Sequence, residues 1–380
     1  MTIAHLSDLT SKAACPRLVV KVGSSLLVGS DGVRRDWLQG LVTELAAARA
    51  RGQDVIVVSS GAIALGAARL GLEKGGRGSL ADAQAAAAVG QIALSGLWAE
   101  LLAEHGITAA QLLLTLEDLE DRRRYLNATA TLTRLLDAGA VPVINENDSV
   151  ATQEIRFGDN DRLAARVAQA AGASAVLLLS DVDGLFDSNP ANPGARRLDE
   201  VRGVTAEIHA MASGGSTSGM GSGGMTSKLQ AAEIAERAGI ALAIASGLHD
   251  APIARACEQR IGTLFLPKDV RGRKAAGRKV WLGGRLRLKG ALVVDAGAAR
   301  ALQRGGSLLA AGIVRVEGQF QRGDAVAVQD EAGAVLAHGL AEYDAADCCR
   351  VLGRKNAEQA ELLGYAPRSA VIHRDQLVLI

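Results

Sequence analysis

The chain has 380 residues, 42 basic and 41 acidic side chains, a formal net charge of +1, and 48% hydrophobic residues with only 3% aromatics. This length has room for about two domains, and the balanced charge does not favour a protein that coats nucleic acid or a membrane surface. No apolar run approaches the ~18 residues that cross a bilayer, and the start, MTIAHLSDLTSK, is too polar for a secretory signal. We therefore expect a cytoplasmic globular protein rich in small aliphatic residues.

The first two thirds of the chain alternate β-branched or leucine-rich runs with longer helical patterns, which is typical of βαβ units. The segment 36–52, DWLQGLVTELAAARARG, has apolar residues at helical spacing and a closing glycine. A charged helical stretch follows at 116–138. We predict an α/β fold with an open, mainly parallel sheet between helices. The expected strands cover 17–23, 54–62, 111–115, 140–148, 173–184 and 240–247.

The composition changes between Lys268 and Lys289, where nine lysines or arginines accompany a single acid. The first part of this stretch, near 266–277, is interpreted as a linker. Beyond it, the segments 312–320 and 324–340 alternate as strands do, and the second contains a DEAG turn. A smaller β-rich domain of about 100 residues is therefore expected at the C-terminal end.

The four cysteines, Cys15, Cys257, Cys348 and Cys349, show neither C-x-x-C spacing nor a histidine at zinc spacing. We expect reduced thiols and no dedicated protein ligands for a metal.

The segment 219–228, GMGSGGMTSK, is rich in glycine and ends in a lysine. It is neither a Walker loop nor a dinucleotide fingerprint, because G-x-x-x-x-G-K-[ST] is absent and no strand precedes the glycines directly. Its end is expected to enter a helix between Met225 and Lys228, where backbone amides and the lysine favour phosphate. The alternative is a flexible linker capped by Thr226 or Ser227.

Other candidate residues follow the predicted strands. Lys21 lies at the end of the first strand, where a lysine among apolar residues needs an anionic partner or a solvated cleft. Ser59, Ser60 and Gly61 close the second strand and permit close approach of a ligand. Because ligands gather at the carboxyl ends of parallel strands, these loops and the glycine-rich segment are expected to share one site.

Two clusters of oxygen-bearing side chains complete the candidates. VINENDSV offers 145–148 directly after a strand, and RFGDNDRLAARVA offers 159–161 before a helix. Such residues commonly make turns and helix caps. Their position at strand ends favours a pocket for a polar ligand that carries an amine, beside a phosphate.

Taken in order, the segments VVKVGSS, VVSSGAIALG, VPVINENDSVATQEIRFGDNDRLAA, LLLSDVDGLF and GSGGMTSKLQAAEIA closely resemble the bacterial glutamate 5-kinases of the amino acid kinase family. GALVVDAGAARAL, SLLAAGIVRVEGQFQRGD and VIHRDQLVLI resemble a PUA domain. The resemblance extends from Leu18 to Ile380. It implies an amino acid kinase domain over 1–266, a basic linker over 267–277 and a PUA domain over 278–380.

The resemblance also implies an activity: transfer of the γ-phosphoryl group of ATP to the side-chain carboxylate of L-glutamate, the first step of proline biosynthesis, with Mg²⁺. Lys21 would meet the transferring group, Lys228 would close over the phosphates, and Asp161 would orient both lysines. The implied ATP-binding residues are Lys21, Ser180, Asp181, Ser222, Gly223, Gly224, Met225, Thr226, Ser227 and Lys228.

The glutamate contacts implied by the resemblance are Ser60, Asp148 and Asn160. Asp148 suits the substrate ammonium, and Asn160 could meet the substrate carboxylates. The chain departs from the family pattern where Thr226 and Ser227 precede the lysine, and at Ser180, where threonine is common. These changes keep a hydroxyl group, so they affect details of the nucleotide contact.

Two alternatives remain. Aspartate, carbamate, acetylglutamate and uridylate kinases share the fold, but the VINEND and FGDND pair and the C-terminal domain argue against them. An RNA-binding protein is the other, since PUA domains elsewhere bind RNA and 268–289 is basic. Few aromatic side chains for stacking accompany that stretch, essentially Trp281, which favours a linker with a role in regulation or assembly. The resemblance suggests a homodimer or tetramer and leaves proline inhibition open.

Overall fold

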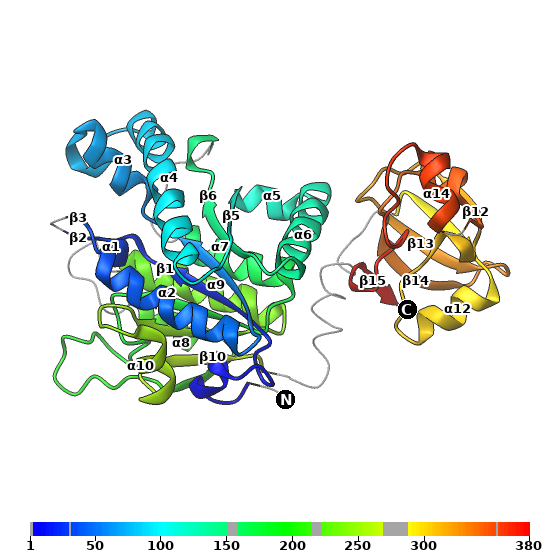
Figure 1. Ribbon diagram of the computed structural model, residues 1–380. Coiled ribbons are helices and arrows are strands. Elements are labelled where there is room, and N and C mark those ends of the chain that lie inside the picture. The colour runs from blue at the N-terminus through cyan, green and yellow to red at the C-terminus, as the bar shows by residue number, and fades with distance from the viewer. Residues whose placement is uncertain (1–2, 30–31, 151–158, 214–221, 269–287, 355) are drawn as a thin grey trace. The chain divides into compact units, whose positions relative to one another are not determined.

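The protein divides into two units, each with its own sheet. The structure, a computed structural model, describes residues 3–29, 32–150, 159–213, 222–268, 288–354 and 356–380. The first unit comprises Met1–Asp121 and Asn127–Lys268, and the second comprises Arg122–Leu126 and Asp269–Ile380. Figure 1 shows the first unit mainly from blue to light green and the sheet of the second from yellow to red.

The first unit is built on an eight-stranded sheet, which confirms the predicted α/β class. Its strand order is β5-β6-β4-β1-β7-β9-β10-β8. All neighbouring pairs are parallel except β9 and β10. In sheet order the strands are β5 (Ala109–Leu114), β6 (Val141–Glu146), β4 (Asp54–Ser59), β1 (Arg17–Val22), β7 (Ala175–Ser180), β9 (Ala241–Ser246), β10 (Thr263–Leu266) and β8 (Glu200–Arg202).

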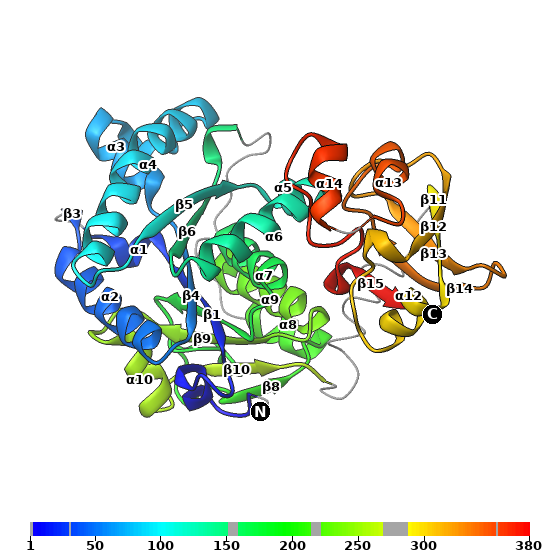
Figure 2. The same ribbon diagram turned by 45° about the vertical axis from the view of Figure 1, so that its right-hand side comes forward.

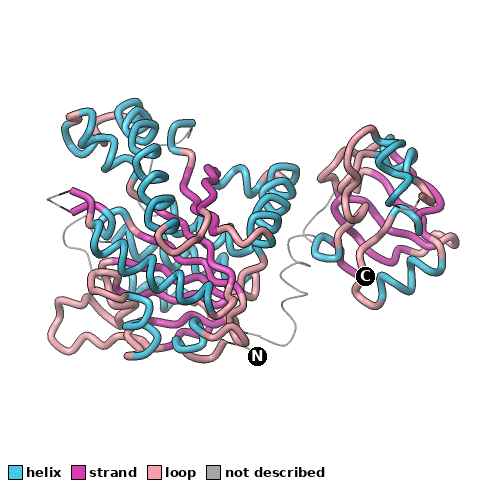
Figure 3. Tube along the Cα trace, in the orientation of Figure 1, coloured by secondary structure: helices cyan, strands magenta, loops and turns pink. Residues whose placement is uncertain are grey.

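Helices cover both faces of this sheet. Alternate strand residues such as Val20, Val57 and Leu177 pack in one core with residues of α2, α4 and α10. On the other face, α7 packs against β1 and β4, and the adjacent helix α9 packs against β9 (Figure 2). Figure 3 shows the same layering of strands between helices. The helices are η1 (Leu6–Thr10), α1 (Ser24–Leu27), α2 (Arg35–Ala50), α3 (Ala62–Leu70), η2 (Glu73–Gly76), α4 (Leu80–Ala103), α5 (Leu116–Glu120), α6 (Arg122–Asp137), η3 (Asp148–Val150), α7 (Asp159–Ala171), α8 (Ala206–Ser213), α9 (Ser222–Arg237) and α10 (Pro252–Glu258).

The six expected strands are all present, and the structure adds elements that the sequence pattern did not predict. β8, at the edge of the sheet, and its neighbour β10 are short strands of three and four residues. In addition, β2 (Val28–Gly29) pairs with β3 (Gly32–Val33) in a small hairpin. The helical stretch expected over 116–138 is present as two helices, because Thr115 caps α5 and the backbone is extended at Asp121 before α6 begins. The helix expected to begin between Met225 and Lys228 begins earlier, at Ser222.

The second unit contains a five-stranded sheet with the order β12-β11-β13-β14-β15. The predicted hairpin is confirmed: β13 and β14 pair antiparallel, and Asp330 Oδ1 accepts the N–H of Ala334 across the turn, where Gly333 has a φ of 87°. Its elements are β11 (Gly290–Val294), α12 (Ala296–Gln303), η4 (Ala310–Gly312), β12 (Ile313–Gly318), β13 (Ala325–Asp330), β14 (Val335–Leu340), α13 (Ala345–Val351), α14 (Asn356–Leu363), η5 (Arg374–Gln376) and β15 (Leu377–Leu379). Residues 269–277 of the expected linker lie outside the described residues.

The helix α4 is long and apolar, although no segment was expected to cross a bilayer. Among the described residues it is the one helix whose length and composition would allow a membrane span, and 44% of its most apolar window is buried. Leu94, Trp98 and Leu101 on this helix belong to the core of the first unit. Part of its apolar surface is therefore buried by packing within the first unit.

Helices α3 and α4 approach each other through two glycines. A Cβ atom added at Gly66 would lie 1.8 Å from the carbonyl oxygen of Ala86, and one added at Gly90 would lie 1.8 Å from that of Ala62. Side chains cannot occupy these positions without separating the helices. The crossing fixes α4 against α3, which follows directly from the end of β4.

We predict that Gly90→Ala lowers the free energy of unfolding by about 1–3 kcal/mol or more, because the methyl group overpacks the crossing. Gly96→Ala on the same helix is the matched control, since its Cβ would meet nothing within 4 Å; alanine there should raise stability by up to about 1 kcal/mol through helix propensity. Urea denaturation measures both. Equal effects of the two substitutions would contradict the close crossing.

Candidate functional site

Lys21 is a buried lysine in the centre of the sheet. It is the next-to-last residue of β1, in register with Val58 of β4 and Leu178 of β7, and only 7% of its surface is exposed. A buried ammonium group is costly unless it is paired. The sequence expectation that Lys21 needs an anionic partner is met by Asp161.

Asp161 lies between two lysines from different elements. Its Oδ1 is 2.5 Å from Lys21 Nζ, and its Oδ2 is 3.0 Å from Lys228 Nζ. Ser227 Oγ also donates a hydrogen bond to Oδ2, at 3.0 Å. Asp161 is 1% exposed and stands near the N-terminal end of α7, whereas Ser227 and Lys228 lie in the first turns of α9. The structure thus brings together the three residues expected to act on the phosphoryl group.

The two ammonium groups control the protonation of Asp161. Burial by itself would raise the pKa of this carboxyl group, but the charges of Lys21 and Lys228 and their hydrogen bonds outweigh burial and lower it below its ordinary value. The aspartate is therefore ionised at neutral pH. One carboxylate between two ammonium groups leaves a net positive charge, which suits an anionic ligand such as a phosphate.

A second group of polar side chains adjoins the first through α7. Asn160, which precedes Asp161, donates through Nδ2 to Ser60 Oγ at 3.0 Å and to Asn145 Oδ1 at 3.1 Å. Asn145 in turn donates to Gln91 Oε1 on α4, at 2.8 Å. The Asn160 Oδ1 atom is buried and has no hydrogen-bond partner among the described residues. Ser60 and Asn160 are thus in direct contact, as expected of residues that share one ligand.

Asp148 opens η3 immediately after the β6 loop and is 8% exposed. It lies close enough to Arg77 to affect it: burial lowers the pKa of Arg77, and the charge of Asp148 opposes that shift. Arg77 was not predicted as a site residue, because the sequence around it, EKGGRGS, is a short surface turn with no strand before it.

The residues expected to bind the nucleotide lie at the carboxyl end of β7 and at the start of α9. Ser180 ends β7 and donates to its neighbour Asp181 at 2.9 Å. Gly224 O lies 3.2 Å from Ser227 Oγ, while Thr226 is exposed. Ser222 and Gly223 form the first turn of α9 with Gly224 and Met225. The preceding glycines at 219 and 221, like the loop 151–158, lie outside the described residues.

Gln91 is a site neighbour that sequence reasoning missed. It lies on the apolar helix α4, and its side-chain oxygen accepts the hydrogen bond from Asn145 of β6. The only signal available was a glutamine within an alanine-rich helix, which is equally typical of a solvent-facing position.

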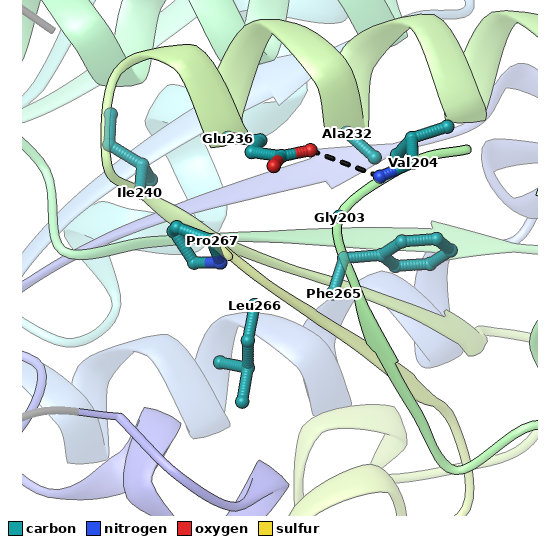
Figure 4. A pocket seen from close by; sticks show the side chains of 8 residues that line it. All are labelled: Gly203, Val204, Ala232, Glu236, Ile240, Phe265, Leu266 and Pro267. Carbon is teal, nitrogen blue, oxygen red and sulfur yellow. Dashed lines mark hydrogen bonds between the residues drawn. The ribbon is translucent and has the colours of Figure 1, made fainter. Parts of the chain in front are cut away.

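A pocket elsewhere in the first unit contains none of these residues. Figure 4 shows it between α9 and the strand β10, with Phe265, Leu266 and Pro267 on one side and Ala232 and Ile240 on the other. The carboxylate of Glu236 accepts the backbone N–H of Val204 there at 3.0 Å. The lining carries no cation, so it does not suit a phosphate.

Cys15, Cys257 and Cys348 are buried and Cys349 is exposed, and all four are free thiols. Burial raises the pKa of the three buried thiols to about 12, so they are protonated and unreactive. Among the described residues no group of three His, Cys, Asp or Glu side chains could hold a metal ion.

The sheet and the paired lysines define an α/β protein with two buried cationic side chains near the carboxyl ends of its parallel strands. A model of the amino acid kinase family matches residues 16–246, and a PUA domain model matches 290–362. The chain therefore belongs to the amino acid kinase family and carries a C-terminal PUA domain.

Curated relatives match over the full length of the chain. A glutamate 5-kinase from Novosphingobium aromaticivorans is 72% identical, with 100% of both chains covered. One from Sphingopyxis alaskensis is 60% identical over 98% of this chain and 100% of the relative. A third, from Zymomonas mobilis, is 54% identical over 96% and 92%.

Substitution of Asp161 by asparagine should lower the free energy of unfolding at neutral pH by about 3–5 kcal/mol, because two buried ammonium groups lose their counter-charge. The pKa of Asp161 is depressed in the folded state. Its contribution is therefore complete above the ordinary aspartate pKa of about 3.9 and disappears as the pH falls through the lower folded value. Chemical denaturation of wild type and variant from pH 7 to pH 3 measures this difference.

The control for this experiment is Asp199→Asn, which removes an ion pair with Arg197. The side chain of Asp199 is 82% exposed. Exposed pairs contribute less than about 1 kcal/mol. Two results would refute the role of the buried carboxylate. One is a loss of unfolding free energy in Asp161→Asn at pH 7 that is no larger than the loss in Asp199→Asn. The other is a difference between wild type and Asp161→Asn that grows below pH 4.

Proposed function

We propose that the protein transfers the γ-phosphoryl group of ATP to the side-chain carboxylate of L-glutamate, giving L-glutamyl 5-phosphate, the first step of proline biosynthesis. The full-length identity of 72% to a curated glutamate 5-kinase supports this reaction. The single structural observation that carries it is the pair of lysines, Lys21 and Lys228, on opposite oxygens of the buried Asp161.

This arrangement fits the chemistry of phosphoryl transfer to a carboxylate. The acceptor is already ionised at neutral pH, so no general base is needed. The barrier lies in bringing anions together while charge spreads over the phosphoryl oxygens. Lys21 from β1 and Lys228 from α9 supply positive charge, and Asp161 keeps the two ammonium groups at a fixed distance from each other. The nucleotide would lie over Ser180, Asp181 and the first turn of α9.

The glutamate would lie on the other side of α7, at Ser60, Asn160 and Asp148. The Ser60 hydroxyl accepts from Asn160, which leaves its own proton to donate to a substrate carboxylate. Asp148 provides a carboxylate for the substrate ammonium. Since Asn160 and Asp161 are consecutive on one helix, the two substrates would meet beside it.

Mg²⁺ would accompany ATP, bound mainly by phosphate oxygens and water, as is usual for this ion. Asp161 is not needed as a ligand of the ion, because its two oxygens are already paired with Lys21 and Lys228. The ion would neutralise charge on the phosphates, and the residues of this chain would orient them.

We further propose that the enzyme works in the cytoplasm as a homodimer or tetramer, and that the PUA domain serves assembly or regulation, including any inhibition by proline. Binding of RNA by the PUA domain remains the second candidate for that domain.

ATP turnover should depend on L-glutamate, with L-aspartate a much poorer acceptor. The aspartate side chain is one methylene shorter and cannot reach the phosphoryl group while its amine is held at Asp148. Trapping the acyl phosphate with hydroxylamine gives the hydroxamate yield for each amino acid in the presence of Mg²⁺. Equal yields from aspartate or acetylglutamate would refute the assignment.

Replacing Lys21 or Lys228 by alanine should each lower kcat by about 10²–10³, the usual effect of removing one preorganised donor to a transition state. Arginine should restore neither, because a planar guanidinium replaces a compact charge. The double variant should lose less than the product of the single losses. If Lys228→Ala raises only the KM for ATP and leaves kcat unchanged, its role is limited to nucleotide binding.

A further inference from the structure

A chain of side-chain hydrogen bonds runs from helix α4 to the proposed glutamate site. It begins at Ser95, whose Oγ accepts from Gln91 Nε2 at 3.1 Å. Gln91 Oε1 accepts from Asn145 Nδ2 at 2.8 Å, and Asn145 Oδ1 accepts from Asn160 Nδ2 at 3.1 Å. The chain ends where Asn160 Nδ2 also donates to Ser60 Oγ.

The direction of this chain follows from Ser95. An amide side chain can be turned by 180° so that its nitrogen and oxygen exchange places, and only its partners decide the orientation. Ser95 Oγ lies 2.8 Å from the backbone carbonyl oxygen of Gln91, which can only accept, and 2.5 Å from Gln111 Oε1. The single hydroxyl proton of Ser95 goes to one of these two oxygens and none is left for the Gln91 side chain, so Gln91 must present its NH₂ group to Ser95 and its oxygen to Asn145. The orientations of Asn145 and Asn160 then follow in turn.

The consequence appears at Asn160. Both N–H groups of its amide are used, by Ser60 and Asn145, and its Oδ1 is buried without a hydrogen-bond partner among the described residues. A buried polar atom left in this state costs about 1–3 kcal/mol. A ligand N–H placed against Oδ1 would remove that cost.

We propose that Gln91, acting through Asn145, is a positioning residue that orients the amide of Asn160 so that Oδ1 accepts a hydrogen bond from the ammonium group of the amino acid substrate. This inference rests on the proposed function for the identity of the substrate. It assigns Asn160 to the amine, together with Asp148, instead of the substrate carboxylates considered from the sequence. Recognition of the α-amine thereby depends on a residue of α4 that need not touch the substrate.

Two substitutions at Gln91 separate orientation from packing. Leucine at this position cannot accept from Asn145, so the amide of Asn145 and then that of Asn160 lose their fixed orientation. Glutamate keeps an acceptor facing Asn145 Nδ2 and should preserve the orientation. Thermal unfolding of both variants shows whether they are folded before any binding is compared.

The readout compares L-glutamate with glutarate, which has both carboxylates but no amine. With Gln91→Leu, we expect the KM for L-glutamate to rise about tenfold, the loss of roughly one buried hydrogen bond. The inhibition constant of glutarate, the KM for ATP and kcat should change little. With Gln91→Glu, the preference for L-glutamate over glutarate should remain close to that of the wild type.

Equal weakening of L-glutamate and glutarate by Gln91→Leu would overturn the inference, since it would indicate a general disturbance of the pocket. Loss of the preference in Gln91→Glu as large as in Gln91→Leu would overturn it as well. Calorimetric titration of the full-length protein with each ligand gives the same comparison without turnover. A wild type that binds L-glutamate more tightly than glutarate but transfers no phosphoryl group would refute the proposed function alone.

Discussion

The carboxylate of Asp161 is the constraint on which the site depends. Two ammonium groups cannot be buried side by side without a counter-charge, and Asp161 supplies it to Lys21 and Lys228 at 2.5 Å and 3.0 Å. Because the lysines come from β1 and α9, this carboxylate also ties the sheet to the helix layer on one face. The charge that stabilises the packing of these elements is therefore the same charge that places both lysines where an anion would bind.

The parallel strands explain why such distant segments meet. β6, β4, β1 and β7 are consecutive neighbours and all run in the same direction. Their carboxyl ends bring Asn145, Ser60, Lys21 and Ser180 to one edge of the sheet, although 159 positions separate Lys21 from Ser180 in the sequence. The helices that follow these strands then supply Asn160 and Asp161. A fold of this type therefore gathers ligands without requiring a contiguous motif.

Much of this arrangement could be predicted from the sequence, because it depends on local patterns. Runs of apolar residues predicted the strands, and the lysine within such a run predicted a buried charge. A turn glycine predicted the hairpin around Gly333. The short strands β8 and β10 could not be predicted in this way, since three or four residues show no clear period. Gln91 and Arg77 were missed for a different reason. Their partners, Asn145 and Asp148, are more than 50 residues away, and the course of α4 depends on its crossing with α3 through Gly66 and Gly90 and on its packing in the core.

The position of Asn160 next to Asp161 links recognition of the acceptor to placement of the phosphoryl donor. Their side chains reach different partners from consecutive positions of α7: Asn160 contacts Ser60 and Asn145, and Asp161 contacts the lysines. A rotation of α7 that improved one set of contacts would disturb the other. Since in-line transfer requires the acceptor oxygen and the phosphorus to lie close together in a fixed direction, a single rigid helix that carries both contacts keeps this alignment better than two independent loops would. The rigidity of α7, with its buried face against β1 and α9, is accordingly as necessary to the proposed reaction as the charges that it holds.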